Sequence, residues 1–220
     1  WFYWPEGEKG PEFDRKKYPD PAQMVDEIHK LDFRLMISIW PEIINPKIKS
    51  DLELQNFMIP GTDWVDIYNP DAGAAFYNYL NDSLLSLGID GLWLDGTEPE
   101  FDKHLGKPTY LGRGDKFANL YSYLTCKYVY ENFEDDYPDK RPLLLTRSAF
   151  AGQQSFGAVT WSGDVNGDWS SFRKQLAAGL NFTMSGIPYW TTDIGGFFRN
   201  AMFAPYDLPH AEKQYNSKEY

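Results

Sequence analysis

Helical segments and short, almost wholly apolar segments alternate along this chain. The apolar segments lack the strict alternation of a strand with one wet face, and amphipathic helices separate them. Unbroken apolar strands that alternate with helices are typical of a parallel sheet covered by helices. The pattern predicts helices at 20–30, 71–87, about 116–133 and about 170–184, and strands at 34–39, 91–95, 142–147, 158–161 and 187–193.

This alternation fits either a (β/α) barrel or an open doubly wound sheet. No glycine-rich nucleotide-binding fingerprint follows any of the five predicted strands, which disfavours the doubly wound sheet. A closed barrel needs eight strands and typically about 250 residues, whereas this chain has 220 residues. We therefore expect an α/β fold of the TIM-barrel class that is incomplete in this chain, an internal piece of one larger catalytic domain.

Polar and aromatic residues stand where the predicted strands end. In barrel enzymes the chemistry sits at the carboxyl ends of the strands, so charged residues there indicate a site rather than packing. Two of them, Asp95 and Asp164, each follow a short apolar run and precede or follow a glycine, which suggests a pair of carboxyl groups for acid/base or nucleophilic work. The strand-end residues are Trp40, Asp95, Arg147, Asp164 and Asp193.

Composition excludes several other classes of function. With 21 Lys and Arg against 32 Asp and Glu, the chain has a net charge of -11, which argues against nucleic acid as a partner. The single cysteine, Cys126, excludes an internal disulfide and lies among apolar neighbours on a predicted helix. The three histidines, His29, His104 and His210, lack metal-ligand spacing, so no metal or other cofactor is expected. No apolar run approaches the length of a membrane span.

The motifs at the strand ends resemble those of a known enzyme family. Four segments are similar to segments of glycoside hydrolase family 31, the α-glucosidase and α-xylosidase family. They are WLDGTEPE (93–100), RSAFAGQQSFGAVTWSGD (147–164), SGIPYWTTDIGGF (185–197) and LMISIWP (35–41). The resemblance implies a (β/α)8 barrel, with Asp95 as nucleophile and Asp164 as general acid/base. It also implies that residues 1–220 lack the barrel's first strand, most of its second and its last.

The same resemblance implies a sugar-binding subsite around the two acids. A guanidinium fork and a carboxylate offer directional donors and acceptors to neighbouring hydroxyl groups, which suits an arginine and a further aspartate. Trp93, which precedes the nucleophile in its motif, belongs to this set as well. The residues implied to contact substrate are Trp40, Trp93, Arg147, Trp161, Asp193 and Phe197.

The identity of the sugar depends on the aromatic residues at the start of the chain. Trp1 and Phe2 resemble the α-xylosidase branch, because a bulky ring beside C5 would exclude the hydroxymethyl group of glucose and admit a pentose. We therefore expect an exo-acting, retaining α-xylosidase that acts on xyloglucan-type oligosaccharides. The alternatives are an α-glucosidase of the same family and an inactive carbohydrate-binding barrel. An aldolase-like barrel is disfavoured, because no strand ends in lysine.

Overall fold

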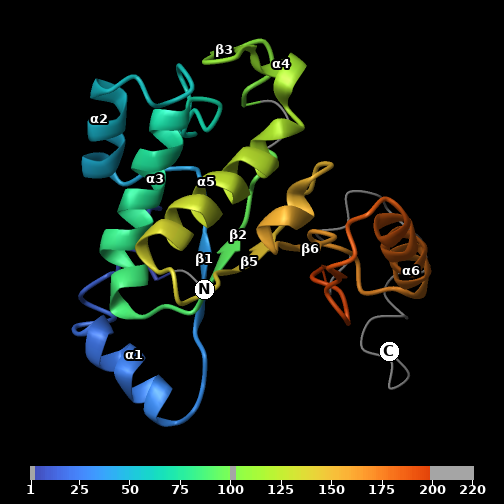
Figure 1. Cartoon of the computed structure of the whole chain (residues 1–220), viewed down its shortest axis with the longest axis horizontal. Helices are drawn as coiled ribbons and strands as arrows, with labels where there is room; N and C mark the ends of the chain where they lie inside the picture. Colours follow the sequence, from blue (N-terminus) through green and yellow to red (C-terminus); the bar gives the residue numbers. More distant parts are fainter. Residues whose placement is uncertain (1–2, 100–102, 199–220) are drawn as a thin grey trace.

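The computed structural model describes residues 3–99 and 103–198, and Figure 1 shows the whole arrangement. Five strands form one parallel sheet, and the helices lie around it. The order along the chain is α1 (Pro21–Lys30), β1 (Met36–Ile39), α2 (Pro46–Leu54), α3 (Pro70–Ser83), η1 (Leu85–Leu87), β2 (Gly91–Leu94), β3 (Pro108–Thr109), β4 (Gly112–Arg113), α4 (Gly114–Phe117), α5 (Leu120–Asp136), β5 (Leu143–Thr146), η2 (Gln153–Phe156), β6 (Val159–Trp161), α6 (Trp169–Met184) and β7 (Trp190–Thr191).

The sheet confirms the predicted parallel architecture. Its strands follow the order β1-β2-β5-β6-β7, so each strand pairs with the next sheet strand along the chain. A doubly wound sheet would reverse this order at a switch point, whereas a barrel wall keeps it. The five strands of this sheet correspond to five consecutive strands of a barrel wall, and the wall formed by the described residues does not close on itself. The remaining two strands, β3 and β4, form a separate antiparallel hairpin in the loop after β2.

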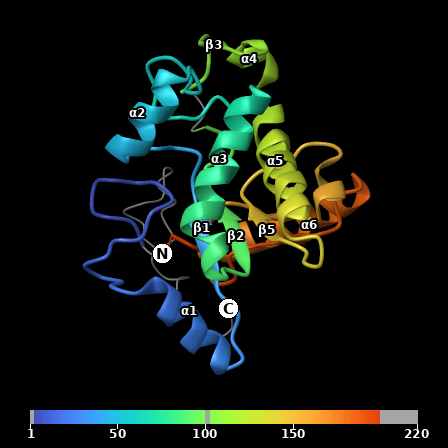
Figure 2. The same ribbon diagram turned by 60° about the vertical axis from the view of Figure 1, so that its left-hand side comes forward.

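Helices α3 and α5 lie side by side across one face of the sheet, as Figures 1 and 2 both show. The outward residues Leu92, Leu94 and Leu144 are almost completely buried beneath them. Gly73 on α3 lets the helices approach closely, because a Cβ there would lie 2.2 Å from the ring of Tyr128 on α5. Cys126 is fully buried on α5, as expected.

The long segment between β1 and α3 differs from its expected form. The prolines in residues 42–69 predict a loop with little regular structure that lies over the active site, but the segment contains helix α2. Pro46 occupies the first turn of that helix, where no backbone N–H is needed, and the side chain of Asn45 caps it by accepting from Lys47 and Ile48. Proline at this position begins a helix rather than preventing one.

The sequence predicts a solvent-facing or packing role for His29 and a solvated end for the acidic helix that closes at Asp136, and both groups connect elements of the fold. His29 at the end of α1 hydrogen-bonds Asp90 through Nε2 at 2.8 Å, and Asp90 also accepts the backbone N–H of Leu35 at 2.8 Å. Asp136 at the end of α5 accepts the hydroxyl of Tyr77 on α3 at 2.9 Å. Both carboxylates therefore join segments that are far apart in sequence.

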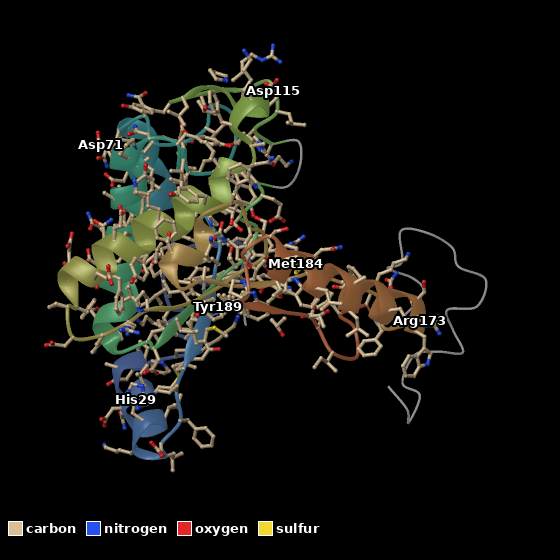
Figure 3. All side chains as sticks on the ribbon, turned by 45° about the vertical axis from the view of Figure 1, so that its right-hand side comes forward. His29, Asp71, Asp115, Arg173, Met184 and Tyr189 are labelled. Atoms are coloured by element: carbon tan, nitrogen blue, oxygen red, sulfur yellow. The ribbon has the colours of Figure 1, made fainter. Side chains whose placement is uncertain are left out.

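Helix α6 projects away from the main body, with Arg173 toward its far end and Met184 near the sheet in Figure 3. None of its residues is buried, and its apolar side chains Leu176, Leu180 and Met184 are 56%, 69% and 86% exposed. Such a face requires a covering layer in a folded barrel. Within the described ranges, no helix is long and apolar enough to cross a membrane.

Candidate active site

The register of the sheet brings the strand-end residues to one level and one face. Ile39 pairs with Leu94, and Leu94 pairs with Thr146, so the next residues, Trp40, Asp95 and Arg147, stand in a row. The backbone continues this alignment, because Asp95 N–H donates to the carbonyl of Ile39 at 2.8 Å. Alternate residues of a strand share a face, so these three side chains point to the face opposite the covering helices.

Trp161 and Asp193 extend the row on the next two strands. Thr146 pairs with Thr160, which places Trp161 beside Arg147, and Trp161 in turn pairs with Thr191. Asp193 lies two residues beyond Thr191 and so follows it on the same face. The strands therefore gather the predicted site residues from widely separated positions in the chain.

Asp95 is 6% exposed and held by two donors. The backbone N–H of Gly96 donates to Oδ1 at 2.8 Å, and Nη1 of Arg147 donates to the same oxygen at 3.2 Å. Gly96 has a φ of 63°, and a Cβ there would lie 3.0 Å from Trp64 and 3.1 Å from Trp40. The turn that aims the carboxylate therefore depends on glycine.

Arg147 lies between two carboxylates. Its Nε contacts Oε1 of Glu98 at 3.0 Å while its Nη1 contacts Asp95. Burial opposes the guanidinium charge, but Glu98 and Asp95 outweigh it and raise the pKa of Arg147. From the sequence alone, Glu98 is a loop acid that is solvated, paired with a nearby Lys or Arg, or beside the site; in the structure it pairs with the arginine that contacts Asp95.

A buried polar network supports the loops that carry these groups. Thr97, two residues after Asp95, lies 3.1 Å from the hydroxyls of both Thr146 and Ser148. Ser122 on α5 donates to the carbonyl of Ser148 at 2.5 Å, and Gln153 donates to the same carbonyl at 3.0 Å. Hydrogen-bonded buried groups fix a backbone more firmly than apolar contacts alone. This network was not foreseen, because its members are common residue types without a motif.

Asp164 follows β6 and faces the same group of charges. It is solvent-exposed, yet the surrounding protein removes enough water to raise its pKa. Arg147 opposes this shift and the negative charge of Asp95 adds to it. A raised pKa is what a general acid needs, because the carboxyl must hold a proton near working pH.

Asp193 belongs to the same electrostatic group. It is half-buried, and burial raises its pKa, with further contributions from Asp164 and Asp95. Its loop lies against the loop that carries Asp164, because the N–H of Phe197 donates to the carbonyl of Val165 at 2.8 Å. The two loops touch at glycines, where a Cβ on Gly196 would lie 2.2 Å from the backbone of Gly167.

The aromatic residues expected to contact substrate have different surroundings. The rings of Trp93 and Trp161 meet edge to face with their centroids 5.4 Å apart. The side chain of Trp161 is only 3% exposed, so it packs against its neighbours rather than facing solvent. Trp40 is half-buried and carries the Lys9 ammonium 3.7 Å from its ring centre. Phe197 is 44% exposed. Trp1 and Phe2 lie outside the described residues.

The described part of the chain has no group of three or more His, Cys, Asp or Glu side chains arranged to hold a metal ion. The described residues bring together four carboxylic acids, Asp95, Glu98, Asp164 and Asp193, with one arginine. Such a set can attack carbon, exchange protons and bind hydroxyl groups.

Comparison with known proteins identifies the family of the chain. The model of the glycosyl hydrolases family 31 TIM-barrel domain matches residues 1–215. An alpha-xylosidase of Saccharolobus solfataricus is 42% identical over 207 residues, which cover 90% of this chain and 28% of that protein. An uncharacterized family 31 glucosidase of Pseudescherichia vulneris is 35% identical, and the match covers 84% of this chain and 38% of that protein.

A solved structure shows the same architecture. The family 31 alpha-xylosidase from a soil metagenome, complexed with xylose, superposes with a TM-score of 0.80 at 33% identity over 90% of this chain and 31% of that one. The chain thus spans about a third or less of the length of that structure and of the curated alpha-xylosidase. Its sequence and its strand order place it in glycosyl hydrolase family 31, as part of that family's TIM-barrel domain.

Proposed function

We propose that the protein containing this chain is a retaining α-glycosidase in which Asp95 is the nucleophile and Asp164 the general acid/base. The observation that carries the proposal is the contrast between the two acids. Asp95 is buried and held by Arg147 and Gly96, whereas Asp164 has a raised pKa and faces the same arginine. A retaining glycosidase needs one ionised and one protonated carboxyl group.

In the first step, an oxygen of Asp95 attacks the anomeric carbon while the bond to the leaving oxygen breaks. Asp164 gives its proton to that oxygen, and a β-linked glycosyl ester of Asp95 remains. In the second step, ionised Asp164 takes a proton from water, the water oxygen attacks the anomeric carbon, and the Asp95 carboxylate leaves. Two inversions return the sugar with its α configuration.

The remaining polar groups bind the sugar in this proposal. Arg147 and Asp193 offer donors and acceptors to its hydroxyl groups, and Phe197, Trp40 and Trp93 supply apolar surface. Trp161 contributes by fixing Trp93 through their edge-to-face contact. The other strands of the barrel, with any sugar contacts they carry, lie outside the described residues in this proposal.

For the substrate, we propose an α-linked xylose at the end of a xyloglucan-type oligosaccharide. The supporting observations are the 42% identity to an alpha-xylosidase and the bulky pair Trp1 and Phe2 at the start of the chain. The second candidate is an α-glucoside, supported by the 35% identity to a family 31 glucosidase. One extra hydroxymethyl group separates these substrates, so steric exclusion beside C5 would decide between them.

The test is hydrolysis of 4-nitrophenyl α-xyloside and 4-nitrophenyl α-glucoside by the full-length protein. We expect a kcat/KM for the xyloside at least about tenfold higher, the discrimination that one pocket clash typically provides. A preference for the glucoside would contradict the xylosidase assignment and leave the nucleophile and acid/base roles standing. Inactivity on both would contradict the proposed enzyme function on these sugars.

A further inference from the structure

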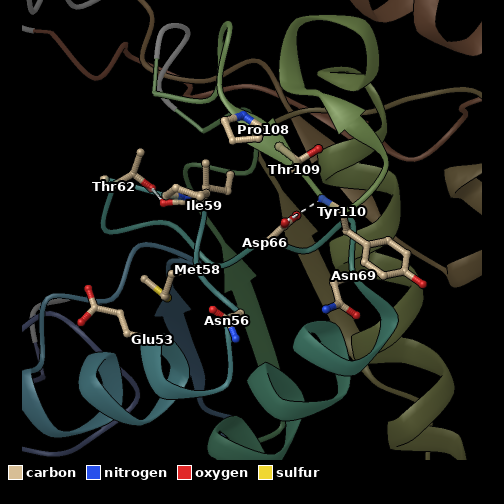
Figure 4. Close-up of a pocket in the computed structure, with 12 residues that line it drawn as sticks. Glu53, Asn56, Met58, Ile59, Thr62, Asp66, Asn69, Pro108, Thr109 and Tyr110 are labelled. Atoms are coloured by element: carbon tan, nitrogen blue, oxygen red, sulfur yellow. Dashed lines mark hydrogen bonds between the residues drawn. The ribbon is translucent and has the colours of Figure 1, made fainter.

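A cavity lies away from Asp95 and Asp164, between the loop that precedes α3 and the β3–β4 hairpin (Figure 4). Its volume is about 430 Å³, within the range of about 300 to 1,000 Å³ that is usual for small-molecule sites. None of Asp95, Arg147, Asp164 and Asp193 lines it. Both segments that form it follow strands at their carboxyl ends, so it opens on the catalytic side of the sheet.

The walls of this cavity are fixed by hydrogen bonds. Asp66 is 6% exposed, and its Oδ2 accepts the backbone N–H of Tyr110 at 2.8 Å, which joins the loop to the hairpin. The hydroxyl of Thr109 closes the hairpin turn on the carbonyl of Gly112 at 2.7 Å. On the other side, Ile59 N–H donates to the carbonyl of Trp64 at 2.8 Å. A site whose walls are already ordered loses little entropy when a ligand binds.

The lining has the chemistry of a site for neutral hydroxyl groups. It offers the carboxylates of Glu53 and Asp66 and the amides of Asn56 and Asn69, and no lysine or arginine lines the cavity. Two lysines lie at its edge: Nζ of Lys49 lies 3.7 Å from Oε1 of Glu53, and Nζ of Lys107 lies 3.5 Å from the Cβ position of Gly61. The lining itself offers carboxylates and amides but no cation, so it suits a neutral ligand with hydroxyl groups better than an anionic one.

The lining also offers apolar surface. Tyr110 is 62% exposed at the tip of the hairpin, and Pro60 and Pro108 border the cavity. An exposed tyrosine ring beside carboxylate and amide groups suits a ligand with an apolar face and a polar rim. A pyranose ring has this character, with C–H groups on its faces and hydroxyl groups around its edge.

We propose that this cavity is a second sugar-binding site, which holds a neutral pyranose unit of a glycan outside the catalytic pocket. The inference rests on the proposed function in its choice of a carbohydrate as ligand. Such a site would retain the enzyme on a long substrate while the catalytic pocket acts on chain ends, because two linked contacts raise the effective concentration of the second. Small glycosides occupy one site only and would gain nothing from it.

The experiment is native gel electrophoresis of the full-length protein in gels that contain soluble xyloglucan or soluble starch, compared with gels that contain neither. Wild type is run beside Tyr110→Ala and Glu53→Ala, which alter opposite walls of the cavity. The matched control is Leu111→Ala, because Leu111 is the other residue of the same turn, is 42% exposed and does not line the cavity. Thermal unfolding of each variant checks that it is folded.

We expect wild type and Leu111→Ala to be retarded in at least one polysaccharide gel, and both cavity variants to lose about tenfold in apparent affinity, the loss expected when stacking or a charged hydrogen bond is removed. All four proteins should hydrolyse 4-nitrophenyl α-xyloside equally. Equal retardation of the Tyr110 and Leu111 variants would overturn the second site. So would loss of retardation in Tyr110→Ala alone, because the sugar would then bind the outside of the hairpin.

The absence of retardation for wild type in both gels would also overturn the proposal. This result is distinguishable from failure of the proposed function, which shows in the chromogenic assay and leaves the gel result unchanged.

Discussion

At the scale of single residues, the site depends on a chain of charges rather than on one acid. Glu98 contacts Nε of Arg147, and Nη1 of Arg147 contacts Asp95, so the acid in the loop after β2 fixes the arginine at the end of β5. Asp164 and Asp193 add two carboxyl groups whose pKa values are raised mainly by loss of hydration.

Azide should separate the nucleophile from the acid/base. In full-length Asp95→Ala, turnover of 4-nitrophenyl α-xyloside should fall by at least about 10⁴-fold, since the ester cannot form. Added azide, attacking opposite the leaving group, should then give a β-glycosyl azide. In Asp164→Ala, azide should attack the glycosyl ester and give the α-glycosyl azide. Product configuration by NMR checks this, and the opposite configurations would show that the roles are exchanged.

The pH dependence of activity should respond to Arg147. Arg147 lowers the pKa of Asp164, against the raising effects of burial and Asp95. Removing the positive charge in Arg147→Gln should therefore raise that pKa further and keep Asp164 protonated to higher pH. The alkaline limb of kcat/KM should move upward, although the rate itself falls. A pH–rate profile measures this, and an alkaline limb that stays in place or moves downward contradicts the assignment of Asp164 as general acid.

Glu98 should act as a positioning residue. In Glu98→Gln the guanidinium loses a charged partner, so its hold on Asp95 and the sugar weakens, and kcat/KM should fall by about 10- to 100-fold. Glu53→Gln, which removes a carboxylate outside the catalytic site, is the matched control and should leave hydrolysis of small glycosides unchanged. Steady-state kinetics on the chromogenic substrate decides, and equal rates for the two variants would contradict the role.

At the scale of elements, the ends of helices and strands are joined by carboxylates that the sequence pattern did not reveal. Asp90 precedes β2 and binds both His29 at the end of α1 and the N–H of Leu35 before β1. Burial opposes ionisation of Asp90, but these donors and Arg34 outweigh it and lower the pKa of Asp90. One side chain thus fixes the entry into two adjacent strands.

Asp90→Asn should reduce stability by about 1–2 kcal/mol near neutral pH, the contribution typical of hydrogen bonds to a charged group. Because the pKa of Asp90 is lowered by folding, its contribution is present above the pKa of the unfolded chain and is lost as pH falls through the folded value. The difference in Tm between wild type and variant should therefore shrink in acid. Thermal unfolding across pH tests this, and a constant or growing difference would contradict it.

At the scale of the whole molecule, the described chain is a section of barrel wall that leaves apolar surface open. Leu180 and Met184 on α6 are 69% and 86% exposed, and Ile194 after β7 is 82% exposed. A sheet of five barrel strands also has two unpaired edges, at β1 and β7. We propose that the rest of a (β/α)8 domain covers these surfaces in the full-length protein.

Residues 1–220 expressed alone should therefore bind a hydrophobic dye and associate, whereas the full-length protein should do neither. Met184→Glu with Leu180→Glu should improve the solubility of the fragment and destabilise the full-length protein, because the same side chains would be buried there. Dye fluorescence and sedimentation measure the first effect and thermal unfolding the second. A full-length protein unaffected by both substitutions would show that α6 stays exposed.

The sequence by itself determined the strand and helix alternation, the parallel sheet and the positions of Asp95, Arg147, Asp164 and Asp193 at strand ends. These follow from local patterns, since apolar runs and glycine turns depend on neighbouring residues. Its errors were also local: Pro46 was interpreted as part of a loop, whereas it begins α2.

Only the tertiary structure decided which of these residues meet. Four features join segments that are distant in sequence. They are the pairing of Glu98 with Arg147, the network around Thr97, the contact of Lys9 with Trp40 and the cavity beside Tyr110. No periodicity in the chain encodes such contacts, because they depend on the strand register and on how the loops fold over it. The register aligns Ile39, Leu94 and Thr146, and thereby turns separate strand ends into one site.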